Sequence, residues 1–276
     1  MILWNKLSLI ILLCGLNAVC FGQNLLDQNN TAQFADFLFK TRQFKYSAQE
    51  YERLHFMDQS NEEYKLFLIR SYRLDNALSL AESRLNSLYG DSICDISKAV
   101  FKELMAIQFD KEDFTSARNY LECNKKIDEY SYSYYQVSIS LLSRNYTEAK
   151  SQVTHSPRLA KPFGAIIAEA DAAKYKSPAL AASLSAIIPG TGKIYSGHWK
   201  DGLIAFVFVA TNVFQAYRGF SLYGTDSAHG WVFGGLAIGF YTGNILGSAK
   251  SASKHNRLID DKIHMHAKDI IFTDLD

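Results

Sequence analysis

Two patterns of hydrophobic and polar positions follow one another along the chain. From about Gln23 to Tyr175, apolar residues recur at helical spacing, as at Phe34 and Leu38, among many Lys, Glu, Asp and Tyr residues. This pattern is typical of amphipathic helices in a soluble domain. From Ser177 to Ser248, the residues are mostly Ala, Gly, Ile, Leu, Val and Phe. The sequence therefore predicts an all-α protein in two parts, with the boundary near residues 155–177.

An internal repeat runs through the first part. An alanine recurs at positions 48, 81, 117 and 149, that is, at intervals of 33, 36 and 32 residues. Such intervals are typical of stacked helix pairs, in which a small residue early in the second helix lets the first helix approach closely. The residues predicted to pack the repeats are Ala48, Ala81, Ala117 and Ala149. An aromatic residue or leucine precedes the last three by three positions, whereas Phe44 precedes Ala48 by four, so the first repeat is slightly out of phase.

The repeated stretch, about Asn30–Val153, resembles the tetratricopeptide repeat family. It departs from the family in lacking the proline that often closes each repeat, and Gln43 or Glu112 stands where glycine separates the two helices. The resemblance implies a helix-pair solenoid with a concave surface that binds peptides or protein partners. Four tyrosines could belong to that surface: Tyr130, Tyr132, Tyr134 and Tyr135. For each of them, packing between repeats is the favoured interpretation.

The second part contains two candidate membrane segments. Gly202–Phe220 and Trp231–Ser248 each approach the roughly 20 residues that a span requires. Within the second, glycines recur every fourth residue, which places four of them on one helix face: Gly235, Gly239, Gly243 and Gly247. We expect another helix to lie close against this face. Pro178–Gly190 is the candidate partner within the chain, and association of two copies through the same face is the alternative.

A glycine-rich motif surrounds these segments. It reads Pro-Gly-x-Gly-x-x-Tyr-x-Gly over 189–197, Asp-Gly at 201–202 and Tyr-x-Gly-Asn-x-x-Gly-Ser over 241–248. The block of about Ser177–Arg257 resembles a membrane domain of bacterial envelope proteins, especially of tetratricopeptide-type proteins of the Bacteroidota, a family with no agreed activity. The resemblance implies membrane attachment. The motif residues singled out are Pro189, Gly190, Gly192, Tyr195, Gly197, Asp201, Gly202 and Asn244. Of these, Asp201 and Asn244 either have a functional role or form a bond across the helix hairpin.

Signals for catalysis are weak. Gly190–Lys193 reads Gly-Thr-Gly-Lys, but Ile187 replaces the first glycine of a phosphate loop and Ile194 replaces its Ser or Thr. His264 and His266 lie near several aspartates, yet a solvated tail explains them better than a metal site. We therefore expect no enzymatic activity, no cofactor and no metal.

The N-terminus has the pattern of an export signal. Met1–Gly22 contains one lysine, an apolar core over Leu7–Leu16 and small residues before a cut at Gln23. Large residues precede both cysteines of this segment, which disfavours lipoprotein processing, and an uncleaved anchor is the alternative. In an oxidising periplasm Cys94 and Cys123 could pair, but the favoured interpretation is two small buried hydrophobic residues.

Charge leaves the membrane topology open. The loop over 221–230 between the two apolar segments has no Lys or Arg. Cationic residues instead flank the pair of segments: Lys193, Lys200, Lys250, Lys254 and Arg257. The positive-inside rule favours a cytoplasmic location for these flanks, but an exported N-terminus places them outside the cytoplasm. We hypothesise a third crossing by Pro178–Tyr195, which would reconcile the two, with a half-inserted segment as the alternative.

Together these patterns predict five consecutive segments: a signal peptide (1–22), a tetratricopeptide-like repeat domain (23–155), a linker helix (156–177), a glycine-rich membrane domain of two to three hydrophobic segments (178–249) and a polar tail (250–276). The formal net charge of +1 gives no basic field for nucleic acid. We expect a bacterial inner-membrane protein whose repeats lie in the periplasm and serve as a scaffold or adaptor for an envelope protein partner. In the alternative, the membrane domain itself assists membrane-protein insertion or transport, and the repeats are regulatory.

Overall fold

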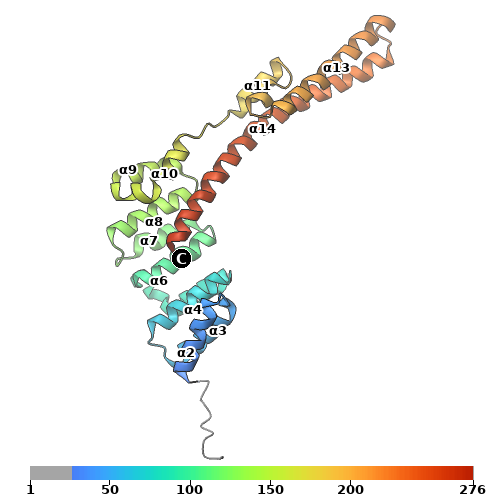
Figure 1. Cartoon of the computed structure of the whole chain (residues 1–276). Coiled ribbons are helices and arrows are strands. Elements are labelled where there is room, and N and C mark those ends of the chain that lie inside the picture. Colours follow the sequence, from blue (N-terminus) through green and yellow to red (C-terminus); the bar gives the residue numbers. More distant parts are fainter. Residues whose placement is uncertain (1–26, 276) are drawn as a thin grey trace, which may run out of the picture. The chain divides into compact units, whose positions relative to one another are not determined.

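The computed structural model describes residues 27–275, and this part of the chain consists of helices with no strand (Figure 1). The prediction of an all-α protein is confirmed. The expected signal peptide lies outside the described residues. The chain divides into two compact units, Met1–Ile127 and Asp128–Asp276, which are described separately.

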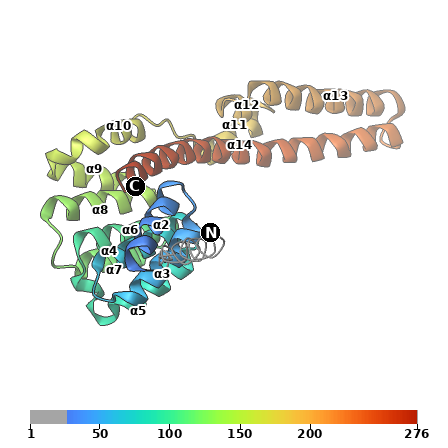
Figure 2. The ribbon, with the colours of Figure 1, turned by 60° about the horizontal axis from the view of Figure 1, so that its bottom comes forward.

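The first unit is built from consecutive helices that each pack against the next (Figure 2). They are α2 (Gln28–Lys40), α3 (Phe44–Met57), α4 (Glu62–Leu74), α5 (Leu78–Tyr89), the 3-10 helix η2 (Gly90–Asp95), α6 (Lys98–Asp110) and α7 (Phe114–Cys123). Their apolar faces meet in a core that includes Leu54, Leu68 and Leu104, each with at most 1% of its surface exposed. The amphipathic periodicity of the sequence is thus satisfied by helix-on-helix packing.

Four tight turns, one inside each helix pair, share a single backbone geometry. Each contains a residue other than glycine in the left-handed conformation, with φ between 55° and 63°: Arg42, Asn76, Glu112 and Arg144. The N–H of the following residue donates to the carbonyl five positions back, as from Gln43 to Leu38 at 2.8 Å and from Asp113 to Gln108 at 2.9 Å. This is the Schellman closure of a helix C-terminus, which usually uses glycine at the left-handed position.

These turns explain why the first repeat is out of phase. Ala81, Ala117 and Ala149 each follow the left-handed residue by five positions (76 to 81, 112 to 117, 144 to 149), and each is completely buried. In the first pair, that position is held by Ser47, which is also completely buried. Its hydroxyl donates to the Ala35 carbonyl at 3.2 Å. The first repeat is therefore in phase with serine as its small residue, and the left-handed residue between its two helices is Arg42 rather than Gln43.

A buried ion cluster holds α4 against α6. The carboxylate of Glu103 is completely buried and accepts from Arg70 Nε at 2.6 Å and from Arg73 Nε at 2.9 Å. Burying a carboxylate is strongly unfavourable unless it is paired, so these two bonds fix the register between the helices.

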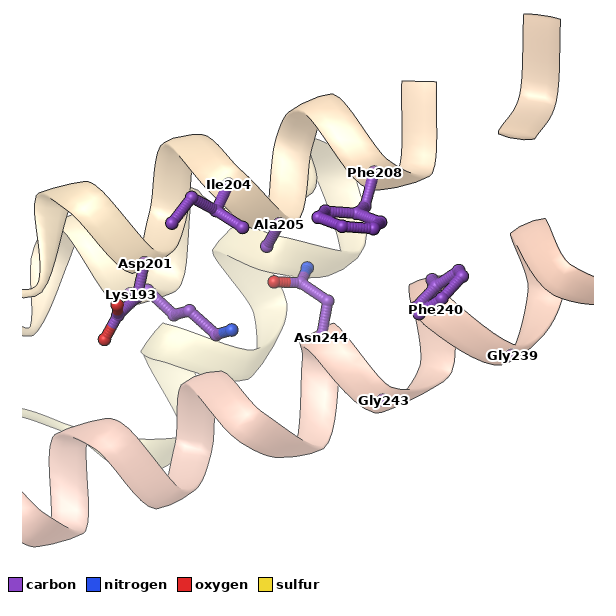
Figure 3. A pocket seen from close by; sticks show the side chains of 9 residues that line it. All are labelled: Lys193, Asp201, Ile204, Ala205, Phe208, Gly239, Phe240, Gly243 and Asn244. Atoms are coloured by element: carbon purple, nitrogen blue, oxygen red, sulfur yellow. The ribbon is translucent and has the colours of Figure 1, made fainter. Parts of the chain in front are cut away.

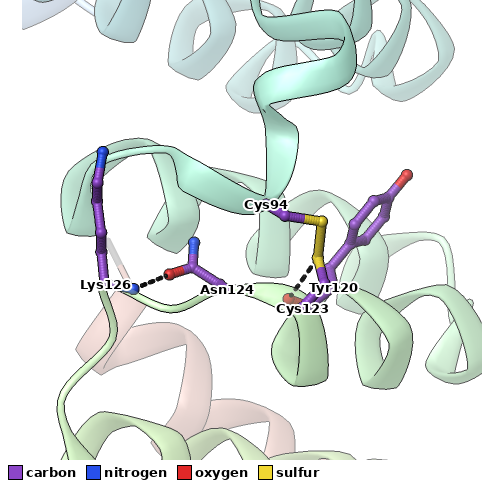
Figure 4. Close-up of a disulfide and its surroundings, with 5 residues drawn as sticks. All are labelled: Cys94, Tyr120, Cys123, Asn124 and Lys126. Carbon is purple, nitrogen blue, oxygen red and sulfur yellow. Dashed lines mark hydrogen bonds between the residues drawn. A yellow bond between two sulfur atoms is a disulfide. The ribbon is translucent and has the colours of Figure 1, made fainter.

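A disulfide joins Cys94 in η2 to Cys123 at the end of α7, with the Cα atoms 5.2 Å apart (Figure 4). The favoured interpretation of two unpaired, buried cysteines is therefore wrong. Both residues are only half-buried. The bond closes a loop between residues 29 positions apart and stabilises the fold by about 3–4 kcal/mol through restriction of the unfolded chain.

The second unit begins with a helix pair and ends in a long hairpin. Its helices are α8 (Glu129–Leu142), α9 (Tyr146–His155), the short 3-10 helix η3 (Pro157–Leu159), α10 (Ala160–Asp171), α11 (Pro178–Ile187), α12 (Thr191–Tyr195), α13 (Trp199–Tyr223) and α14 (Ala228–Leu275). Figure 1 shows α13 beside the N-terminal half of α14 and the C-terminal half of α14 beside α8 and α10, in agreement with the contacts between these helices.

The C-terminal residues do not form a solvated polar tail. Residues 250–275 continue α14 without interruption and bury Ile263, Ala267 and Ile271. These apolar residues recur every fourth position and so lie on one helix face, which packs on α8 and α10. Because α14 packs on α8, the helix pair α8/α9 belongs to the same compact unit as the hairpin. The boundary between the two units therefore falls after Ile127, not near residues 155–177 as the sequence predicted.

The left-handed turns generate a prediction on stability. Replacing Glu112 by glycine should stabilise the chain by about 0.5–1 kcal/mol, because relief of the left-handed strain exceeds the entropic cost of glycine. Lys111→Gly is the matched control: its φ is −80°, so glycine there only adds chain entropy and should lower stability. Thermal unfolding of both variants measures the effect, and a shift of both in the same direction would contradict the assigned turn.

Candidate functional site

The hairpin of α13 and α14 exposes large apolar side chains around most of its circumference. They include Leu203, Ile204, Phe206, Val207, Val213, Phe214, Val232, Leu236, Ile238 and Leu246. Both helices are long and apolar enough to cross a membrane, and only 22% and 17% of their apolar windows are buried. A helix in the core of a soluble protein would be mostly buried, so this exposure favours a lipid environment. The 25 residues of α13 extend about 37 Å, enough to cross the hydrocarbon layer.

The motif glycines let backbones touch at the base of the hairpin. A Cβ atom on Gly190 would lie 2.0 Å from the carbonyl oxygen of Gly202, and one on Gly192 would lie 1.8 Å from that of Ala181. Gly190 and Gly197 also have φ of 89° and 87°, which favours glycine. Pro189 follows the end of α11, where it cannot continue the helix. The motif therefore builds a tight junction of α11, α12 and α13.

Hydroxyl groups join α11 to α14. Ser185 and Ser248 are both completely buried, and their Oγ atoms lie 2.7 Å apart. Ser185 Oγ also accepts from the Gly192 N–H at 2.9 Å, and Tyr241 donates its hydroxyl to the Ala186 carbonyl at 2.5 Å. These contacts were not among the predictions from the sequence. The signal was present, since small polar residues in apolar helices commonly bond across helix pairs.

The glycine face of α14 is largely open. Within residues 27–275, no atom outside the local helix lies within 4 Å of a Cβ built on Gly235, Gly239 or Gly243. At Gly247, the nearest atom is Cε of Lys193 at 3.6 Å. The expectation that Pro178–Gly190 covers this face is wrong, because α11 packs on the neighbouring face that carries Ser248.

A pocket of about 360 Å³ lies where α12, α13 and α14 meet (Figure 3). It is lined by Lys193, Asp201, Ile204, Ala205, Phe208, Gly239, Phe240, Gly243 and Asn244. Two of the predicted motif residues, Asp201 and Asn244, thus come together with two of the open glycines. Lys193, which the sequence analysis treated only as a flanking charge, is the third polar residue of this pocket.

The side chain of Asn244 is buried without a partner. It is 4% exposed, and neither Nδ2 nor Oδ1 has a hydrogen-bond partner in the described part of the chain. In Figure 3 it extends from α14 toward Ala205 on α13. Leaving such a group unsatisfied costs about 1–3 kcal/mol. The sequence analysis allowed a bond across the hairpin for Asn244. No such bond is present within residues 27–275, so the amide is free to bind a molecule that enters the pocket.

The pocket changes from charged to apolar along its length. Lys193 and Asp201 lie at the end next to the tight junction, and neither takes part in an ion pair among the residues described. At the other end the rings of Phe208 and Phe240 are in contact, with centroids 5.5 Å apart. Asn244 lies between the two ends. The arrangement can therefore bind a molecule with a charged end and an apolar end.

Comparisons with family models, with curated proteins and with solved structures find no match to this chain. Arguments about its function therefore rest on its own residues and geometry.

The two kinds of glycine generate a second prediction. Gly192→Ala should destabilise the purified chain by about 1–3 kcal/mol or prevent folding, because the added Cβ would overlap the Ala181 carbonyl. Gly239→Ala is the control, since its Cβ has open space and alanine favours the helix. Thermal unfolding in mild detergent should show a lower Tm for the first variant only. Equal behaviour of the two would contradict the packing of the junction.

Proposed function

We propose that this chain is a membrane-anchored, exported scaffold of the bacterial envelope, which binds a protein partner through its helical repeats. The observation that carries the proposal is the continuity of α14. This helix of 48 residues forms one arm of the apolar hairpin and then packs on α8 and α10. The hairpin therefore holds this helical platform rigidly, rather than through a flexible tether.

Polar contacts reinforce the attachment of α14 to the platform. Arg144 pairs with Asp261 at 2.9 Å, and the carboxylate of Glu169 accepts from Lys262 at 2.7 Å and contacts His266 Nδ1 at 2.8 Å. Hydrogen bonds from Lys262 and His266 lower the pKa of Glu169. A lowered carboxyl pKa means that the contact contributes stability at neutral pH and loses it as the pH falls through that pKa.

The same packing supports two membrane crossings rather than three. Since the C-terminal end of α14 contacts α8 and α10, this end and these two helices must lie on the same side of a membrane. The chain between α10 and the end of α14 therefore crosses the membrane an even number of times. The helices α13 and α14 supply two crossings. The segment of the hypothesised third crossing, Pro178–Tyr195, consists of two short helices, and the longer one, α11, has ten residues and extends only about 15 Å. This favours the alternative of a half-inserted segment.

Two features favour a location of the repeats outside the cytoplasm. The disulfide between Cys94 and Cys123 is typical of an oxidising compartment. The export pattern of residues 1–22 also directs the following chain outward. The lysines at the base of the hairpin then face the periplasmic headgroup layer. The first hydrophobic segment usually dominates orientation, which accounts for the departure from the positive-inside rule.

The repeats supply the surface for a partner. The three helix pairs of the first unit and the α8/α9 pair of the second unit share the same left-handed turn, which supports tetratricopeptide-like repeats. The family resemblance implies protein or peptide binding. In the first unit, Phe34 and Phe37 on α2 are 51% and 56% exposed. Since the two rings lie three residues apart on α2, they form a small apolar patch, and we propose this patch as the contact surface.

The pocket around Asn244 favours a second candidate function, in which the membrane domain itself assists insertion or transport and the repeats are regulatory. A polar group buried in a membrane segment is commonly functional. The two candidate functions differ in the part of the chain that recognises the partner: the repeats in the scaffold function, and the membrane domain in the insertion or transport function.

Topology provides the third prediction. Single cysteines would be introduced at Lys161, Met265 or Thr225 in a chain whose own cysteines are replaced by serine. All three positions are exposed. A membrane-impermeant maleimide applied from the periplasmic side should label Lys161→Cys and Met265→Cys but not Thr225→Cys. Labelling of Lys161→Cys and Met265→Cys from opposite sides would exclude two crossings.

Partner capture provides the fourth prediction. The tagged full chain is purified from membranes in mild detergent, and the proteins that accompany it are quantified. Under the scaffold proposal, Phe34→Ser with Phe37→Ser should lower their recovery about tenfold or more, as expected for two hot-spot side chains. Asn244→Leu, which replaces the amide by an apolar group, should leave recovery unchanged. The reverse result would support the membrane domain as the active part.

A further inference from the structure

We infer that the pocket at the base of the hairpin binds one zwitterionic glycerophospholipid that carries a primary amine, of the phosphatidylethanolamine type. The inference rests on the proposed insertion of α13 and α14 into a membrane. It concerns a ligand site, whereas anchoring alone requires only an apolar surface. Three independent features of the pocket support it: the order of its chemical groups, its opposite charges and its unpaired amide.

The groups along the pocket follow the order of groups along a phospholipid. Lys193 lies over Gly247 at the charged end, Asn244 comes next along α14, and Phe240 and Gly239 follow toward the middle of the hairpin. From Gly247 to Gly239 the helix extends about 12 Å. A phospholipid presents its headgroup, then its ester groups and then its acyl chains, so each part meets a side chain of matching chemistry.

The two opposite charges at the charged end of the pocket, Lys193 and Asp201, determine which headgroup can bind. The ammonium of Lys193 is a suitable donor to a phosphate oxygen. The carboxylate of Asp201 can accept from a primary ammonium, and charge-assisted bonds of this kind are the strong ones. A lipid with a phosphate but no amine brings a negative charge close to Asp201 and no ammonium to offset it, and a headgroup hydroxyl could give Asp201 only a neutral hydrogen bond, which is weaker. The pair therefore favours a zwitterionic lipid over an anionic one.

The buried amide of Asn244 accounts for the middle of the ligand. Its Nδ2 can donate to an ester carbonyl of the glycerol region of the lipid, which gives this donor a partner that the described residues do not supply. The volume of about 360 Å³ is at the small end for ligand sites, so it suits the headgroup and glycerol rather than a whole lipid. The acyl chains would leave over the open face of Gly243 and Gly239, against Phe208 and Phe240.

The test first separates membrane insertion from lipid binding. Membranes containing the full chain are washed with alkaline carbonate. Release of the chain would overturn the proposed membrane anchoring and this inference with it. If the chain stays, it is placed in nanodiscs of equal phosphatidylethanolamine and phosphatidylglycerol, extracted into mild detergent, and the lipids retained per protein are measured by native mass spectrometry. We expect phosphatidylethanolamine to be retained about tenfold over phosphatidylglycerol.

Matched variants locate the site. Lys193→Ala should lower retention of phosphatidylethanolamine about tenfold, and Asp201→Asn should abolish the preference between the two lipids. Lys200→Ala, an exposed lysine of the same region outside the pocket lining, should change neither. Gly243→Leu should block retention while the chain folds, because no atom lies within 4 Å of its Cβ. Gly235→Leu is its control, since it is equally open but does not line the pocket.

Four results would overturn the inference while leaving membrane anchoring intact. Equal retention of the two lipids by the unmodified chain would exclude selection by Asp201. Equal effects of Lys193→Ala and Lys200→Ala would indicate general surface attraction. Retention unchanged by Gly243→Leu, or native mass spectra with a second copy in place of lipid, would show that lipid does not occupy this pocket.

Discussion

The uninterrupted backbone of α14 is the constraint on which the second unit depends. No proline occurs after residue 189, so the helix from Ala228 to Leu275 keeps its hydrogen bonds from the apolar hairpin into the platform of α8 and α10. Sharp bends in helices need a proline, a π-bulge or an inserted group. The two ends of α14 therefore keep a fixed orientation to each other. One end carries the apolar segment of the hairpin, and the other carries the buried face of Ile263, Ala267 and Ile271. This rigidity is why the packing of one end of α14 determines how the other end can cross a membrane.

Glycine has two opposite uses in this hairpin, and only distances distinguish them. Gly190, Gly192 and Gly202 are places where backbones touch, since an added Cβ would come within 2.6 Å of a carbonyl oxygen at each. Gly239 and Gly243 instead face open space beside the pocket. In the first group glycine permits the fold, and a larger residue would break it. In the second group glycine leaves room, and a larger residue would only fill that room.

Local pattern was enough to predict the helical class, the repeat spacing and the apolar hairpin, because each depends on residues close in sequence. The errors concern contacts between distant residues. The pairing of Cys94 with Cys123 depends on the separation of two Cα atoms, and sequence spacing does not give that distance. The packing of the last 26 residues of α14 was missed because their many charges suggested a solvated tail. The four-residue recurrence of Ile263, Ala267 and Ile271 was the signal that could have found it. In the candidate site, Asp201 and Asn244 followed from the motif, whereas Lys193 joined them only through the fold.

The polar groups of the hairpin also bear on how anchoring and ligand binding are related. An anchor needs apolar side chains. Lys193 and Asp201 lie at the headgroup end of the proposed site, but the amide of Asn244 lies between the apolar helices and opposes transfer into lipid. Asn244 adds the cost of an unpaired buried amide. A leucine at that position would anchor the chain better, so attachment alone does not explain the amide, whereas the proposed lipid would give it a partner. Because Asn244 lies on the same continuous helix that packs on α8 and α10, a lipid bound there would rest on the element that orients the platform. The proposed scaffold and the proposed lipid site would thus be two uses of one helix, because the lipid contacts would restrict how the platform stands on the membrane.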